Sequence, residues 1–126
     1  MTDNSKIIYV IDDSETVLKK TKSFLKDTDY EVYYFTNPME ALDKMKDVSP
    51  HLILLDYFMN EMNGDEFMIK VSERLLHYHD WQVYLISSHK FTQEEQLSML
   101  TLGITEVLEK PLEKDKLLNA IDKINH

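Results

Sequence analysis

The sequence predicts an α/β domain in which five parallel strands form one sheet with helices on both faces. Three observations support this prediction. Short apolar runs, rich in β-branched and aromatic residues, alternate along the chain with segments whose apolar residues recur at helical spacing. The run at residues 52–55 is apolar throughout, which is typical of a strand buried on both faces. Polar residues directly follow these runs, as expected where parallel strands end at one edge of a sheet.

The first two βα units occupy the first third of the chain. Residues 6–11 form the first predicted strand, and the following helix has its apolar face at Val17, Leu18, Thr21, Phe24 and Leu25. Glu31–Phe35 is the second strand. Asn37 then predicts a helix cap, because Pro38 takes the first helical position and Glu40 lies three residues after the cap. The buried side of this helix is predicted at Ala41, Leu42 and Met45.

Three further units complete the predicted fold. The third strand is at residues 52–55, and residues 63–66 open a helix that carries Phe67, Met68, Val71 and Leu75. Residues 82–86 are the fourth strand, and residues 92–95 cap a helix with Leu97, Met99 and Leu100. Residues 104–108 are the fifth strand, and the last helix has a stripe of Leu117, Leu118, Ile121 and Ile124. Because βαβ crossovers are right-handed, we expect the doubly wound, flavodoxin-like strand order 2-1-3-4-5.

Composition limits the possible functions. The 126 residues suit a single domain, and 43% are apolar. The net charge of -9 argues against a nucleic-acid-binding surface, which needs clustered basic side chains. The lack of cysteine excludes disulfides and thiolate metal sites and fits a cytoplasmic protein. We expect neither a signal peptide nor a membrane span, since no apolar run approaches about 20 residues.

The expected strand order brings three carboxylates into one crevice. Strands one and three would be neighbours, about 4.8 Å apart, and Asp12, Asp13 and Asp56 follow their carboxyl ends. Carboxylates this close raise one another's pKa or bind a cation, and an all-oxygen site suits Mg²⁺. Ser87 and Lys110 follow strands four and five at the same edge. A nucleophilic aspartate, a metal, a hydroxyl and an ammonium group together suit phosphoryl transfer, with Asp56 as the nucleophile.

Four segments in order, "VIDDS", "LLDYFMNEMNG", "LISSH" and "EKPL", make the chain resemble the response-regulator receiver domains of two-component signalling, particularly the stand-alone, chemotaxis-regulator type. The resemblance implies that Asp56 is the phosphoacceptor of an aspartyl phosphate. It implies that Asp13 binds Mg²⁺ directly and Asp12 largely through water, with the backbone carbonyl of Phe58 as a further ligand. Ser87 would be the switch hydroxyl. Lys110 would pair with Asp56 or its phosphate, with a cis bond to Pro111.

The resemblance also implies a signalling role for the chain. Residues 1–126 would be a single receiver domain without an output domain. The phosphoryl donor would be a phosphohistidine on a sensor histidine kinase or a histidine phosphotransfer protein, and the receiver would catalyse its own phosphorylation. The output would be contact with a downstream protein through residues 91–125, where Leu100, Leu102 and Leu112 mix with Glu95, Glu106 and Lys114, and a homodimer could use the same face.

Several positions depart from the family pattern. Val107 stands where the family usually has the aromatic residue that rotates on activation, so this form of switching is not available. Asn60 replaces a common proline, and Ser88 a common alanine or glycine. Phe58 and His89 occupy the two positions that often set the dephosphorylation rate. Since a bulky apolar Phe58 cannot orient an attacking water, we predict a long-lived phosphoryl group.

Other functions remain open at this stage. A receiver-fold scaffold whose output is independent of phosphorylation is the main alternative, and Val107 motivates it. A haloacid-dehalogenase-like phosphohydrolase would need an aspartate in place of Phe58. A nucleotide-binding flavodoxin-like protein would need a glycine-rich loop, but only Gly64 and Gly103 are present. His77 and His79 suggest a metal site only weakly, because residues two apart do not share a helix face.

Overall fold

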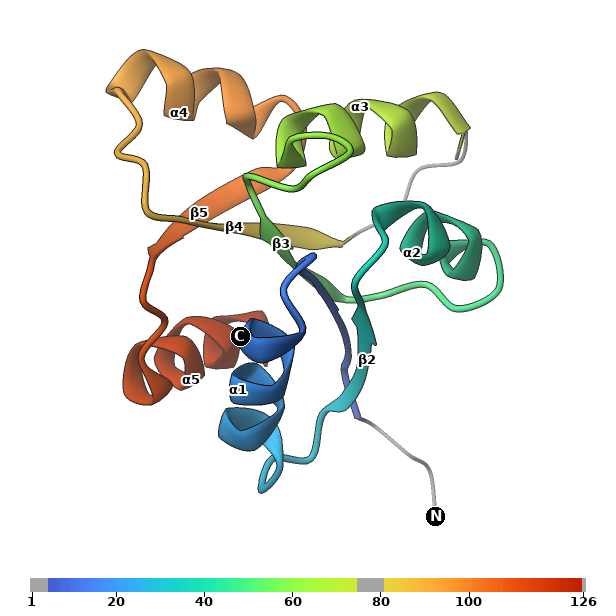
Figure 1. The fold of residues 1–126 in the computed structure, drawn as a ribbon, viewed down its shortest axis with the longest axis vertical. Coiled ribbons are helices and arrows are strands. Elements are labelled where there is room, and N and C mark those ends of the chain that lie inside the picture. Colours follow the sequence, from blue (N-terminus) through green and yellow to red (C-terminus); the bar gives the residue numbers. More distant parts are fainter. Residues whose placement is uncertain (1–4, 75–80, 126) are drawn as a thin grey trace.

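A computed structural model describes residues 5–74 and 81–125, and it confirms the predicted fold class. Five parallel strands form one sheet in the order β2-β1-β3-β4-β5 (Figure 1). The strands are β1 (Ile7–Ile11), β2 (Glu31–Phe35), β3 (Leu52–Asp56), β4 (Gln82–Ser87) and β5 (Ile104–Glu109). The helices are α1 (Glu15–Leu25), α2 (Pro38–Met45), α3 (Gly64–Arg74), α4 (Gln93–Leu100) and α5 (Lys114–Asp122), with a 3₁₀ turn at Lys123–Asn125.

The second strand has the predicted bounds, and each of the other four differs from the prediction by one residue at one end. β1 begins at Ile7 rather than Lys6, and β3, β4 and β5 each extend to the polar residue that follows the apolar run. Asp56 pairs with Ile86, and Ser87 pairs with Glu109, as members of the parallel ladder. Pairing uses backbone groups, so the polarity of a side chain does not end a strand. Consequently the site residues Asp56 and Ser87 belong to the rigid sheet rather than to its loops.

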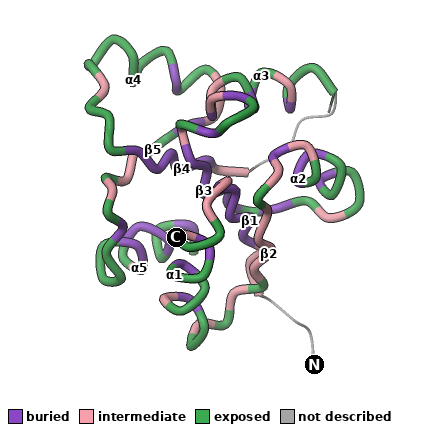
Figure 2. Tube along the Cα trace, viewed as in Figure 1, coloured by how far each residue is buried: buried purple, intermediate pink, exposed green. Residues whose placement is uncertain are grey.

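Helices cover both faces of the sheet and leave its strands in the centre. α2, α3 and α4 lie on one face and α1 and α5 on the other (Figure 1). Alternate side chains of β1 enter different cores: Tyr9 and Ile11 pack under the first group of helices, and Ile8 and Val10 under the second. All five residues of β3 are buried, as Figure 2 shows for the centre of the molecule. The predicted strand buried on both faces is therefore confirmed.

The predicted helix starts at Asn37 and Thr92 are confirmed. The Asn37 side chain accepts a hydrogen bond of 2.9 Å from the backbone N–H of Met39, and Thr92 forms a reciprocal capping box with Glu95. Leu75 of the predicted third helix lies outside the described residues. Within the part of the chain that the structure describes, no helix has the length and apolar character required to cross a bilayer.

The predicted contact face needs one correction. Leu112 is buried in the core beneath α1 and α5, so it does not contribute to a surface. The residue follows Pro111 at the turn into α5 and packs inward there, which the local pattern of apolar and charged residues does not reveal. Leu97 and Leu100 of α4 are in contrast 59% and 52% exposed, so the apolar character of the face lies on α4.

Gly64 offers a test of the packing beside the site. A Cβ atom there would lie 2.8 Å from Cδ1 of Leu85 and 3.1 Å from the backbone oxygen of Asp56. Gly64→Ala is therefore expected to lower the free energy of unfolding by about 1–3 kcal/mol, through overpacking. Urea unfolding measures this, with Ser72→Ala on the exposed side of the same helix as the control. Equal stability of the two variants would contradict the prediction.

Candidate functional site

Three carboxylates lie together where β1 and β3 end. Oxygen atoms of Asp12, Asp13 and Asp56 all lie within 4.8 Å of one another. Asp12 and Asp13 directly follow β1, and Asp56 is the last residue of the adjacent β3. β2 and β4 lie on opposite sides of this pair, so the chain winds in opposite directions from it. The crevice therefore occupies the topological switch point at which doubly wound sheets bind ligands.

Lys110 supplies a positive charge to this cluster from the end of β5. Its Nζ lies 2.9 Å from Oδ1 of Asp56 and 3.6 Å from Oδ2 of Asp12. The first distance is that of a charge-assisted hydrogen bond, and the second is too long for a hydrogen bond. The peptide bond between Lys110 and Pro111 is cis, as the resemblance implied. The structure thus brings the predicted lysine and aspartates together.

One buried carboxylate oxygen in the cluster accepts no hydrogen bond from the described residues. Oδ1 of Asp12 accepts a 2.9 Å hydrogen bond from the Ser14 N–H, but Oδ2 is buried and accepts none from the described residues. Oδ2 of Asp13 accepts a 2.8 Å hydrogen bond from the Asn60 N–H. A buried oxygen without a donor is costly, and a bound cation would satisfy it. The oxygen-only donor set therefore fits a hard divalent ion such as Mg²⁺.

Burial makes the charged form of these carboxylates unfavourable. Desolvation raises the pKa of Asp56 from 3.8 to about 6, against the hydrogen bond from Lys110, which lowers it. Desolvation also raises the pKa of Asp12 above its usual value. Burial alone would lower the pKa of Lys110, but its hydrogen bond to Asp56 and the nearby Asp12 charge more than compensate, so its pKa is raised. Lys110 is therefore charged at neutral pH, and the Asp56 carboxylate is a stronger base than an ordinary aspartate.

Ser87 and His89 lie beside the cluster at the end of β4. Ser87 is buried, and its Oγ accepts a 2.9 Å hydrogen bond from the backbone N–H of His89. The backbone N–H of Lys110 donates to the carbonyl oxygen of Ser87 at 3.0 Å, which joins the ends of β4 and β5. The Ser87 hydroxyl thus accepts a backbone hydrogen bond within the turn that follows β4.

The other predicted tuning residues lie on the loop after β3 and within β5. Phe58 follows β3 by two residues and is 55% exposed, while its backbone forms an antiparallel bridge with Asn63. Val107 is half-buried on β5. His77 and His79, considered as a weak metal motif, lie outside the described residues.

Sequence reasoning singled out Phe58 and His89 but did not find Tyr57 and Phe91, nor the contacts among these rings. Tyr57 lies with its ring centroid 4.6 Å from Phe58 and 5.0 Å from Phe91. The only available signal was that Tyr57 directly follows β3 and Phe91 lies four residues after β4. Aromatic residues near strand ends are common and do not indicate a contact. Similarly, backbone donors such as the Asn60 N–H carry no side-chain signature.

The fold and the site define a class: a doubly wound α/β domain with three aspartates and a lysine at the carboxyl ends of its strands. The family model for the response regulator receiver domain matches residues 8–122, so the chain belongs to this family. It is a receiver domain of the kind found in phosphorylation-based signalling by CheY-like response regulators.

Proteins with similar sequences and structures agree with membership of the receiver-domain family. The chemotaxis protein CheY of Listeria monocytogenes is 26% identical over 118 residues, covering 92% of this chain and 95% of the relative. The histidine-protein kinase BarA of Escherichia coli is 26% identical over 96% of this chain, which spans 13% of BarA. The structure of Vibrio cholerae CheY4 matches with a TM-score of 0.83 at 24% identity, over 95% of this chain and 98% of CheY4, and supports the fold.

Proposed function

We propose that this protein is a response regulator that accepts a phosphoryl group from a phosphohistidine onto Asp56, with Mg²⁺, and signals through phosphorylation-dependent protein contacts. The observation that carries the proposal is the buried Asp56 carboxylate, which lies beside two other aspartates and is paired with Lys110 at 2.9 Å. A buried, compensated carboxylate at a topological switch point suits a nucleophile. The same site would catalyse phosphoryl transfer to itself.

The transfer would be an in-line displacement at phosphorus. A carboxylate oxygen of Asp56 forms the new O–P bond as the N–P bond of the donor breaks. The electron pair of the broken bond goes to the imidazole nitrogen, which takes a proton from solvent. With a pKa of about 6, Asp56 is mostly ionised at neutral pH and can attack without a separate base. Lys110 and the Ser87 hydroxyl would contact the phosphoryl oxygens.

The aspartates would hold the metal. Asp13 would bind Mg²⁺ directly, Asp12 largely through water, and the Phe58 carbonyl and Asp56 would complete the protein ligands. Oδ2 of Asp12 supports this assignment: it accepts no hydrogen bond from the described residues and has only the Lys110 Nζ at 3.6 Å, so a cation or its water would supply a closer partner. When bound, Mg²⁺ spreads the negative charge of the transferring group. The carboxylates would thereby remain ionised despite their burial.

The proposed partners follow from the family. A sensor histidine kinase or a histidine phosphotransfer protein would donate the phosphoryl group, and a downstream protein would read the phosphorylated state in the cytoplasm. The match to CheY over 95% of its length supports a CheY-like regulator. The contact face would comprise α4, β5 and α5, where Leu97 and Leu100 are exposed, and a homodimer could use the same surface.

Intact mass provides the test of the proposed function. After incubation with a small phosphodonor and Mg²⁺, the wild-type protein is expected to gain the mass of one phosphoryl group. A chelator is expected to abolish the gain. A phosphohydrolase would instead release phosphate continuously without a stable adduct. If a phosphorylated histidine kinase as well as the small donor leaves the mass unchanged, the proposal fails.

Phe58 leads to a prediction about the lifetime of the phosphoryl group. Phe58→Asn is expected to speed its loss roughly tenfold, because one water-orienting hydrogen bond in the transition state is worth about 1.4 kcal/mol. The decay of the phosphorylated mass over time measures this rate. Phe58→Leu, which keeps an apolar side chain, is the control and should decay like the wild type. An asparagine variant that decays no faster would show that Phe58 does not control the lifetime.

One observation favours a second candidate function. Val107 provides no aromatic side chain at the position that usually moves on activation, so the domain could act as a scaffold whose contacts ignore phosphorylation. A surface or assembly state that is identical before and after phosphoryl uptake would favour this candidate. The compensated Asp56–Lys110 pair argues against it, since a scaffold gains nothing from keeping a buried carboxylate.

A further inference from the structure

Four aromatic rings form a closed cycle beside the phosphoryl site. The centroid distances are 4.6 Å from Tyr57 to Phe58, 6.3 Å from Phe58 to His89, 4.7 Å from His89 to Phe91, and 5.0 Å from Phe91 to Tyr57. The ring planes meet at 74–86°. Edge-to-face contact is a favoured aromatic geometry, and each ring here contacts two others. We call these four residues the ring cycle.

The ring cycle joins the two loops that leave the site. Tyr57 directly follows Asp56, and His89 is two residues after Ser87. The His89 N–H donates to Ser87 Oγ at 2.9 Å, so turning this hydroxyl toward a phosphoryl group on Asp56 would remove that acceptor. Tyr57 thus connects the ring cycle to Asp56 at the end of β3, and His89 connects it to the Ser87 hydroxyl, which would respond to phosphorylation.

Phe91 connects the ring cycle to α4. It immediately precedes Thr92, the N-cap of α4, and its carbonyl oxygen accepts a 3.1 Å hydrogen bond from Nε2 of Gln96. The capping box between Thr92 and Glu95 holds the first turn of the helix together. A displacement of Phe91 would therefore also displace the first turn of α4.

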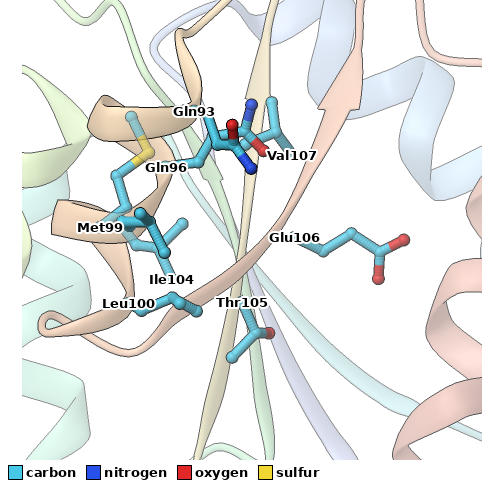
Figure 3. A pocket seen from close by; sticks show the side chains of 9 residues that line it. Gln93, Gln96, Met99, Leu100, Ile104, Thr105, Glu106 and Val107 are labelled. Atoms are coloured by element: carbon cyan, nitrogen blue, oxygen red, sulfur yellow. The ribbon is translucent and has the colours of Figure 1, made fainter.

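There is room for Phe91 to move. An open hollow of about 310 Å³ at the surface is lined by Ser87, His89, Phe91, Gln96 and Val107. A valine rather than a large aromatic side chain at position 107 leaves this space open. Gln96 and Val107 also line a groove of about 250 Å³ between α4 and β5, and they lie at the same end of it (Figure 3). The two spaces therefore share a wall.

We propose that Phe91, held in the ring cycle, couples the Ser87 hydroxyl to the groove between α4 and β5 and acts in place of the aromatic side chain that β5 lacks. This inference rests on the proposed phosphorylation of Asp56. On phosphorylation, Ser87 turns inward, the turn at His89 relaxes, and Phe91 shifts into the adjacent hollow. The first turn of α4 follows, which changes the groove presented to a downstream protein.

Hydrogen exchange of α4 tests the coupling. The probe is beryllofluoride with Mg²⁺, a stable mimic of a phosphoryl group, and mass spectrometry follows amide exchange in peptides that cover residues 93–100. The variants are Phe91→Leu, which removes the ring but keeps apolar volume, and Phe91→Tyr, which keeps the ring. Phe24→Leu, a half-buried aromatic of α1, is the matched control. Exchange in β3 and β4 without the mimic checks that each variant is folded.

We expect the mimic to change α4 exchange in the wild type, Phe91→Tyr and Phe24→Leu, and most of this change to be lost in Phe91→Leu although the mimic still binds. Binding without any change in α4 exchange of the wild type would overturn the coupling alone, as would a Phe91→Leu response equal to that of the wild type. Failure of the wild type both to bind the mimic and to take up phosphate would overturn the proposed function, and the coupling with it.

Discussion

Replacing Asp56 with asparagine is expected to abolish phosphoryl uptake completely, because the amide oxygen of asparagine is not a nucleophile and cannot form a stable acyl phosphate. The substitution preserves the shape of the side chain, which is buried at the end of β3. Lys110 keeps an acceptor within reach, since its Nζ lies 2.9 Å from Oδ1 of the present carboxylate. Loss of uptake would therefore report on the chemistry of this atom rather than on a collapsed site.

Asp65→Asn is the matched control for this experiment. Asp65 lies in the first turn of α3, beyond the same loop, and its Oδ1 accepts a hydrogen bond from the Glu66 N–H. The control should gain one phosphoryl group from a small donor in the presence of Mg²⁺, as the wild type does. An Asp56→Asn protein that gains the same mass would place the acceptor at another residue and refute the proposed role of Asp56.

The second large effect is the pH dependence of stability in metal-free buffer. The folded-state pKa of Asp56 is about 6, against 3.8 as its ordinary value, because burial penalises the ionised form. Between these two values the folded state binds more protons than the unfolded state, so stability falls as the pH rises. The stabilising contribution is fully present below about 3.8 and is lost as the pH passes through about 6. The shift corresponds to roughly 3 kcal/mol.

Comparison with Asp56→Asn isolates this contribution from the other carboxylates. The variant lacks the titrating group, so its free energy of unfolding relative to the wild type should increase between about pH 4.5 and about pH 7.5 by most of the 3 kcal/mol or so. Urea unfolding at both pH values, with a chelator present, measures this difference. Mg²⁺ should then stabilise the wild type at the higher pH, because it binds the folded carboxylates.

A constant difference between the two proteins at the two pH values would contradict the raised pKa of Asp56. If the stability of the variant relative to the wild type instead decreased with pH, the pKa of Asp56 would be lowered in the folded state. The hydrogen bond from Lys110 would then have a larger effect on this pKa than burial. In either case burial would not disfavour the ionised form of Asp56, and the argument for a cation at this site would weaken.

Much of the fold follows from local patterns. The unbroken apolar run of β3 indicated a strand buried on both faces, and the helix starts at Asn37 and Thr92 followed from capping chemistry. These signals are local, because a helix cap and a strand face depend on neighbouring residues. The limits of the strands were less predictable, since Asp56 and Ser87 join the ladder through backbone groups that carry no sequence signature.

The candidate site was predictable because its members share one topological rule. Asp12 and Lys110 each follow a parallel strand and Asp56 is the last residue of one, and all such strands end at one edge of the sheet. The expected strand order was then sufficient to bring them together. The surface was harder to predict: Leu112 looked like part of a contact face but is buried, because burial at the turn into α5 depends on what lies opposite.

The amino-acid sequence by itself determined the order of strands and helices, the family of the domain, and the set of acidic and basic groups in the crevice, because these depend on residue types and their spacing. Only the tertiary structure decided which buried carboxylate oxygen accepts no hydrogen bond, that Lys110 pairs with Asp56 more closely than with Asp12, and that four rings close into a cycle. Such features depend on distances between residues far apart in the chain, and packing sets those distances only after the sheet and helices have assembled.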